Sequence, residues 1–159
     1  MAFLILPFVV ILFMLGLTAQ ESQLVQSMPG AGPVGRMDAL AQASAAQIGM
    51  FGTACIDAAT AAPGVVSDDL LVTPPAGAAL PRQAVCMTTA DPGGGRNVYG
   101  YVPLAPGAAT RLLADTGGSA IWYQVTGAGQ AVNLSTGAAS NVPASIPAQS
   151  LLVWAKTAS

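Results

Sequence analysis

The chain has 159 residues, of which only 8% are charged, and its 5 Lys and Arg against 7 Asp and Glu give a net charge of −2. A nucleic-acid interface needs clustered Lys and Arg, so we expect no nucleic acid as a partner. Histidine is absent, which removes the commonest general base and metal ligand. We therefore expect a protein that is not an enzyme, with no cofactor, no metal site and no small-molecule substrate.

The N-terminal residues form an uncharged apolar run of nearly membrane-spanning length. Met1–Thr18 reads MAFLILPFVVILFMLGLT, and about 20 apolar residues cross the hydrocarbon core as a helix. We expect residues 1–19 to be an uncleaved transmembrane anchor. Two alternatives stay open: a buried core helix, and a signal peptide cleaved after Ala19, for which Leu17 is a poor match to the small residue required. N-terminal sequencing of the mature protein separates the anchor from the signal peptide.

The residues that follow predict a linker and then one long amphipathic helix. Residues 20–35 are polar and then rich in Pro and Gly, which is typical of a linker. Within residues 36–61, apolar and small side chains recur at three- and four-residue spacing and define one face of a helix. They are Met37, Leu40, Ser44, Ile48, Phe51 and Cys55. Residues 36–159 are expected to form a single extracytoplasmic domain.

After Pro63 the sequence changes to short β-prone runs separated by Gly- and Pro-rich turns. Strands are expected at residues 82–89, 98–102, 119–126, 130–134 and 150–155, and a short helix at residues 106–115. Several strands that follow one long helix favour an α+β fold: an N-terminal transmembrane helix, one long amphipathic helix, and an antiparallel sheet with a short extra helix.

Cys55 and Cys86 are the two cysteines of the chain. In an exported protein, two cysteines usually form one disulfide, which here would tie the long helix to the first strand. Two buried free thiols are the alternative. A catalytic thiol is disfavoured because no histidine is present to activate it.

Two further motifs could carry chemistry, but each has a simpler explanation. Gly93–Gly95 with Arg96 is glycine-rich, yet a strand and not a helix follows it, so it predicts a hairpin turn and not a phosphate site. Asp68 and Asp69 are adjacent, and neighbouring side chains on extended backbone point to opposite faces, so we expect them in a solvated loop.

Aromatic side chains concentrate in the predicted strands. Core packing is the default interpretation of such residues. The second interpretation is a protein interface, because aromatics are enriched at interface centres. The candidate interface residues are Tyr99, Tyr101, Trp122 and Tyr123, with alternation placing Tyr99 and Tyr101 on one face of a strand.

Two long segments resemble the PilM family of conjugative thin type IV pili, which is distinct from the cytoplasmic actin-like protein of the same name. They are VYGYVPLAPGAATRLLADTGGSAIWYQV at Val98–Val125 and TGAASNVPASIPAQSLLV at Thr136–Val153. The shared features are turns and apolar runs, while the paired cysteines and the Cys86 strand depart from the family pattern.

The resemblance implies a small pilin-like envelope protein that takes part, without catalysis, in the assembly of a type IV pilus or a related secretion system. It implies a single-pass protein of the inner membrane, with its domain in the periplasm and other pilus or secretion-system proteins as partners. The alternative is a secreted or periplasmic binding module that signal cleavage releases.

Overall fold

The structure is a computed structural model that describes residues 32–157. The expected anchor at residues 1–19 and most of the expected linker lie outside these residues. Within residues 32–157, no helix combines the length and the apolarity needed to cross a bilayer. The chain divides into two compact units, Met1–Leu40 and Ala41–Ser159.

Helix α2 spans Pro33–Ala61 and begins three residues before the expected start. Proline fits the first position of a helix because it has no N–H to leave unpaired there. The helix ends shortly before Gly64, whose φ of 77° is in the left-handed region that favours glycine. Of the expected apolar face, Ile48, Phe51 and Cys55 are buried. In the first turns, which belong to the N-terminal unit, Met37 and Leu40 are exposed.

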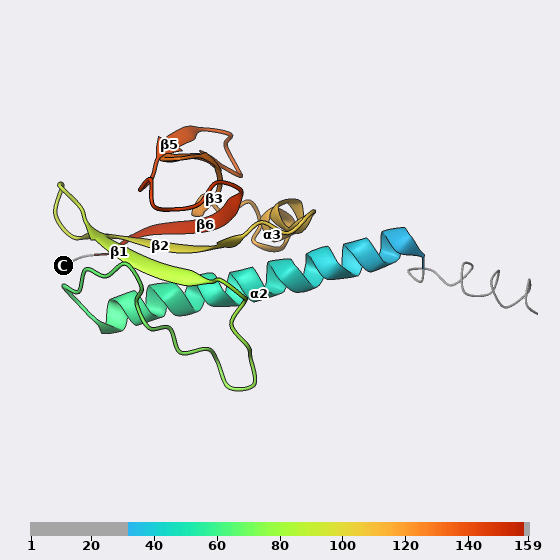
Figure 1. Cartoon of the computed structure of the whole chain (residues 1–159), viewed down its shortest axis with the longest axis horizontal. Helices are drawn as coiled ribbons and strands as arrows, with labels where there is room; N and C mark the ends of the chain where they lie inside the picture. Colours follow the sequence, from blue (N-terminus) through green and yellow to red (C-terminus); the bar gives the residue numbers. More distant parts are fainter. Residues whose placement is uncertain (1–31, 158–159) are drawn as a thin grey trace, which may run out of the picture. The chain divides into compact units, whose positions relative to one another are not determined.

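The expected antiparallel sheet is present and has six strands in the order β1-β2-β6-β3-β4-β5. The strands are β1 (Val85–Ala90), β2 (Arg96–Pro103), β3 (Trp122–Gly127), β4 (Gln130–Asn133), β5 (Ala139–Asn141) and β6 (Ser150–Thr157). The short helix α3 spans Ala108–Asp115. Figure 1 shows α2 running along the β1–β2–β6 side of the sheet. The three-residue strand β5 was not expected from the sequence.

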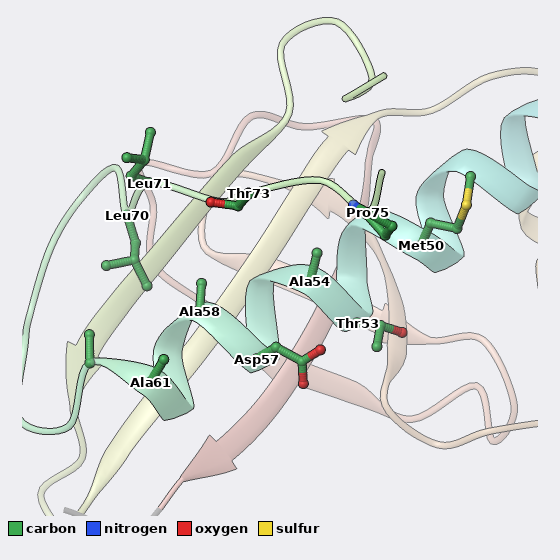
Figure 2. Close-up of a pocket in the computed structure, with 11 residues that line it drawn as sticks. Met50, Thr53, Ala54, Asp57, Ala58, Ala61, Leu70, Leu71, Thr73 and Pro75 are labelled. Atoms are coloured by element: carbon green, nitrogen blue, oxygen red, sulfur yellow. The ribbon is translucent and has the colours of Figure 1, made fainter. Parts of the chain in front are cut away.

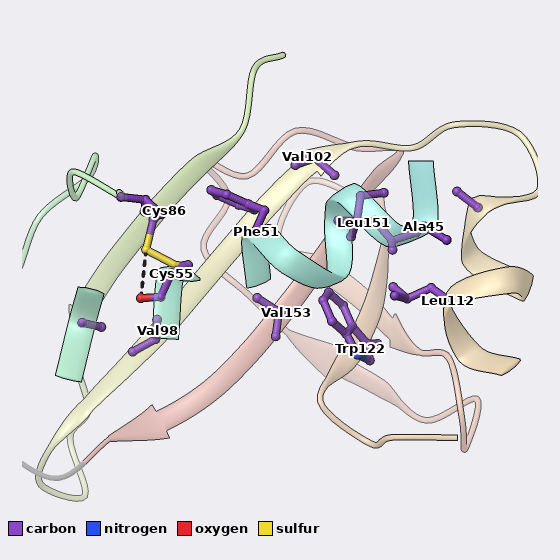
Figure 3. Close-up of a cluster of buried hydrophobic side chains, with 14 residues drawn as sticks. Ala45, Phe51, Cys55, Cys86, Val98, Val102, Leu112, Trp122, Leu151 and Val153 are labelled. Carbon is purple, nitrogen blue, oxygen red and sulfur yellow. Dashed lines mark hydrogen bonds between the residues drawn. A yellow bond between two sulfur atoms is a disulfide. The ribbon is translucent and has the colours of Figure 1, made fainter. Parts of the chain in front are cut away.

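Buried side chains form one hydrophobic cluster on each face of the sheet. The first cluster joins α2 and α3 to the sheet and includes Phe51, Leu112, Trp122 and Val153 (Figure 3). The second lies on the opposite face. It includes Tyr99 and Leu152 together with residues of the β5–β6 connection, Val142 and Ile146. Because both faces are covered, the strands carry apolar side chains in both directions.

Two glycines allow α2 to lie close to the sheet. A Cβ atom built on Gly52 would lie 2.6 Å from the Trp122 ring, and one on Gly100 would lie 3.1 Å from Cys55 Sγ of α2. Both distances are shorter than ordinary van der Waals contact. Gly52, which weakens the helix locally, is therefore explained by packing.

Cys55 and Cys86 form the disulfide that the sequence favours (Figure 3), with their Cα atoms 5.6 Å apart. It links α2 to β1, and both cysteines are buried. The sequence separation is 31 residues. A loop of this length gives about 3–4 kcal/mol of stabilisation in the chain-entropy model.

The Gly93–Gly95 segment forms the expected turn between β1 and β2, because the Asp91 N–H donates to the Gly95 carbonyl at 3.1 Å. Arg96, which follows the turn, is 3% exposed and caps the end of α2. Its guanidinium donates to the carbonyl oxygens of Ala59, Ala62 and Val65 at 2.8–2.9 Å. The arginine thus donates to one carbonyl of the last turn and to two just beyond the helix, where a cation is also favoured by the helix dipole.

Candidate interaction surfaces

The four aromatic residues that were candidates for an interface do not form one patch. Trp122 belongs to the cluster under α2, whereas Tyr99, Tyr101 and Tyr123 belong to or pack against the cluster on the opposite face. Tyr99 and Trp122 are each 4% exposed, and the other two are half-buried. Tyr99 and Tyr101 share a face, as alternation predicts. A contact role for the four residues stays a prediction.

Two tyrosines on the second face, Tyr99 and Tyr123, lie beside Trp154, another aromatic residue of the predicted strands. The Trp154 ring centroid lies 5.7 Å from that of Tyr99 and 5.4 Å from that of Tyr123. The Trp154 indole N–H donates to Asn97 Oδ1 at 3.0 Å. Burial raises the pKa of the Tyr99 hydroxyl, so this phenol stays neutral. The geometry is that of a packed aromatic cluster in which the Trp154 indole N–H is hydrogen-bonded.

The acidic residues of the loops differ in their surroundings. Asp68 and Asp69 are exposed, as expected for a loop pair. Asp91 is paired with Lys156 at 2.8 Å, and hydrogen bonds from Lys156 and then from the Gly93 N–H lower the pKa of its carboxyl. Within residues 32–157, no three His, Cys, Asp or Glu side chains gather in a way that could hold a metal ion.

A groove of about 660 Å³ lies between α2 and the segment that leads from the helix to β1 (Figure 2). We call residues 70–83 of that segment the strap. Small and apolar side chains make up most of the lining, and Asp57 is the only ionisable one among the described residues that line it. The lining residues are Met50, Thr53, Ala54, Asp57, Ala58, Ala61, Ala62, Leu70, Leu71, Thr73 and Pro75.

Further cavities follow the same seam toward the start of α2. A small one shares Met50, Ala54 and Pro75 with the groove. The next, of about 250 Å³, is lined by Gln47 and Pro81 and also by Arg82. The seam between α2 and the strap is thus indented over most of its length.

The strap begins as extended backbone at the outer edge of β1. Just before it, Ser67 and Thr88 exchange two backbone hydrogen bonds, and the Leu70 N–H donates to the Cys86 carbonyl at 2.6 Å. Leu71 is 89% exposed and Val72 is 7% exposed, which is the alternation of a strand. The backbone N–H groups of Leu71, Val72 and Thr73 have no hydrogen-bond partner in the described part of the chain.

Sequence reasoning missed this groove. The strap has neither helical periodicity nor a long β-prone run, and its Pro and Gly residues are typical of any loop. A signal was present in the alanines of α2, because a helix face built of small side chains leaves room for another chain to approach.

Comparison with known proteins adds a solved structure with a similar fold. No protein-family model and no curated protein sequence matches the chain. The crystal structure of a protein named putative protein PilM, from Escherichia coli B7A, has a similar fold. The two chains are 20% identical, the match covers 74% of this chain and 93% of that one, and the TM-score is 0.51. At this identity, the likeness shows a shared fold.

Proposed function

We propose that the chain is a non-catalytic member of the PilM family that takes part in the assembly of a conjugative thin type IV pilus or a related secretion system. The observation that carries the proposal is the fold, which matches PilM over 93% of that chain. It agrees with the resemblance of residues 98–125 and 136–153 to the family, which rests on sequence alone.

We further propose that the protein is held in the inner membrane by its first 19 residues, with its domain in the periplasm. The apolar run at Met1–Thr18 supports this location, because it has nearly the length that a bilayer requires. The Cys55–Cys86 disulfide also supports it, since disulfides persist in oxidising compartments such as the periplasm.

In this proposal the domain acts by contact with other proteins of the assembly. The chain has no histidine, and the groove presents a single carboxylate, so the parts of acid–base and covalent catalysis are not gathered there. A domain fixed at a membrane meets other anchored proteins at a raised effective concentration, so weak contacts are sufficient for assembly.

Removal of the chain from its native host is expected to reduce conjugative transfer to the level of a strain without the pilus. The full-length chain supplied in trans should restore it. A chain with Asp68→Asn, Asp69→Asn and Asp115→Asn should restore it equally, because contact does not require these carboxylates. Transfer frequency in matings, with protein level checked by immunoblot, measures both outcomes. Normal transfer in the absence of the chain would contradict the proposal. So would an Asn variant that is present at the normal protein level and binds its partners but does not restore transfer.

A further inference from the structure

We propose that the groove between α2 and the strap binds an extended, apolar peptide segment of another protein, and that a lysine or arginine of that segment pairs with Asp57. The inference deepens the proposed function by giving the chemistry of the partner. It rests on that proposal only in taking the partner to be a protein.

The shape of the groove suits a polypeptide. Its volume of about 660 Å³ lies within the range of sites that enclose most of a small ligand or peptide. In Figure 2, Ala54, Ala58 and Ala61 line the helix side toward the strap, and Leu70 points in from the strap. Alanine side chains let the backbone of a bound peptide approach the helix. The larger apolar lining residues, Met50, Leu70 and Leu71, can then contact the side chains of that peptide.

The charge of the groove selects among apolar ligands. Asp57 is exposed and makes neither a hydrogen bond nor an ion pair with the described residues, so its carboxylate is available to a ligand. Asp68 and Asp69 add negative charge directly before the strap. A fatty acid or another anionic amphiphile would be repelled, whereas an apolar peptide with a cationic side chain is attracted.

The strap supplies hydrogen bonds that an extended peptide can use. The N–H groups of Leu71 and Thr73 are unpaired within residues 32–157. The Leu70 N–H points to Cys86 on β1, so on extended backbone these two N–H groups point to the opposite edge. An extended segment can add to such an edge by main-chain hydrogen bonds while its side chains fill the adjoining pocket. Affinity would come from the backbone, and selectivity from Asp57.

A second copy of this chain is a poor occupant. Apolar runs of the chain that end in a cation include Gly77–Arg82, which belongs to the strap itself, and Leu151–Lys156. The second run lies in β6, which is hydrogen-bonded to β2 on one side and to β3 on the other. Leu151–Lys156 would have to leave the centre of the sheet to reach a neighbour, and Gly77–Arg82 already lies against α2 of its own chain. We therefore take the peptide to come from a different protein.

The test is fluorescence anisotropy of the full-length protein in lipid nanodiscs, titrated with two labelled peptides of about ten residues. Both alternate Leu and Ala, and they differ in one central residue, Arg or Glu. The Arg peptide should bind about fivefold more tightly, as one surface ion pair provides. Asp57→Asn should remove this preference without weakening the binding of the Glu peptide.

A matched pair of variants locates the binding. Ala61 and Ala46 are both exposed on α2, but only Ala61 lines the groove. Ala61→Trp should abolish binding and Ala46→Trp should not, with both proteins melting like the wild type. Dodecanoate, an anionic amphiphile, is titrated as a competitor. The inference would be overturned if the two peptides bound equally or not at all, or if both Trp variants lost binding equally. It would also be overturned if dodecanoate bound more tightly than the Arg peptide. None of these outcomes depends on the transfer phenotype, so the proposed function is tested separately.

Discussion

Replacing Trp122 with Ala is expected to lower the free energy of unfolding by about 3–5 kcal/mol, the range for truncation of a large buried aromatic side chain. The ring is 4% exposed and lies against Gly52 of α2, where no side chain is available to fill the space it would leave. The substitution would leave a cavity between the helix and the sheet, and the contacts across it would be lost. Chemical denaturation of the full-length protein, with the disulfide intact, measures the loss.

Ile121 provides the control because it is the preceding residue and is 38% exposed. Ile121→Ala should change stability by less than about 1 kcal/mol, since surface substitutions have small effects. If Trp122→Ala were as stable as Ile121→Ala and instead impaired assembly, the ring would be a contact residue. The interface interpretation of the sequence would then hold, and the core described for Trp122 would be wrong.

Replacing Arg96 with Met should cost about 3 kcal/mol. The substitution keeps much of the buried stem but leaves the carbonyl oxygens of Ala59, Ala62 and Val65 without their charged donor. Hydrogen bonds to charged groups are among the stronger ones, and a buried acceptor that loses its partner destabilises the fold by its desolvation free energy. The end of α2 should fray, which hydrogen exchange of its last amides would detect alongside denaturation.

Two further substitutions separate the geometry of Arg96 from its charge. Arg96→Lys keeps the charge but not the planar fork that reaches three acceptors, so it should be intermediate. Arg111→Met removes a surface arginine whose ion pair with Asp115 is exposed, so it should change stability by less than about 1 kcal/mol. Equal stability of the Arg96 and Arg111 variants would refute the capping role.

Much of the fold could be predicted from local pattern. The periodicity of Ile48, Phe51 and Cys55 identified both the helix and its buried face. The glycine-rich turn before Arg96 identified the β1–β2 hairpin, and the even number of cysteines favoured a disulfide. These features depend on neighbouring residues or on residue chemistry, so one sequence is enough to reveal them.

The features that sequence reasoning missed depend on contacts between distant residues. Arg96 caps carbonyls that lie 31–37 positions earlier in the chain, and no local pattern records such a pairing. Alternation shows that Trp122 and Tyr123 point to opposite faces, but not which of them faces α2. Strand β5 has only three residues, Ala139–Asn141, with no apolar side chain larger than alanine to mark it.

The central claim, that this chain serves pilus assembly by contact, is tested most directly by counting pili on cells in electron micrographs. Three strains are compared: one without the chain, one with Ala61→Trp and one with Ala46→Trp. The two variants are present at equal protein levels. The account predicts bare cells in the first strain, sharply fewer pili in the second, and normal numbers in the third. Normal pilus numbers on cells that lack the chain would contradict it.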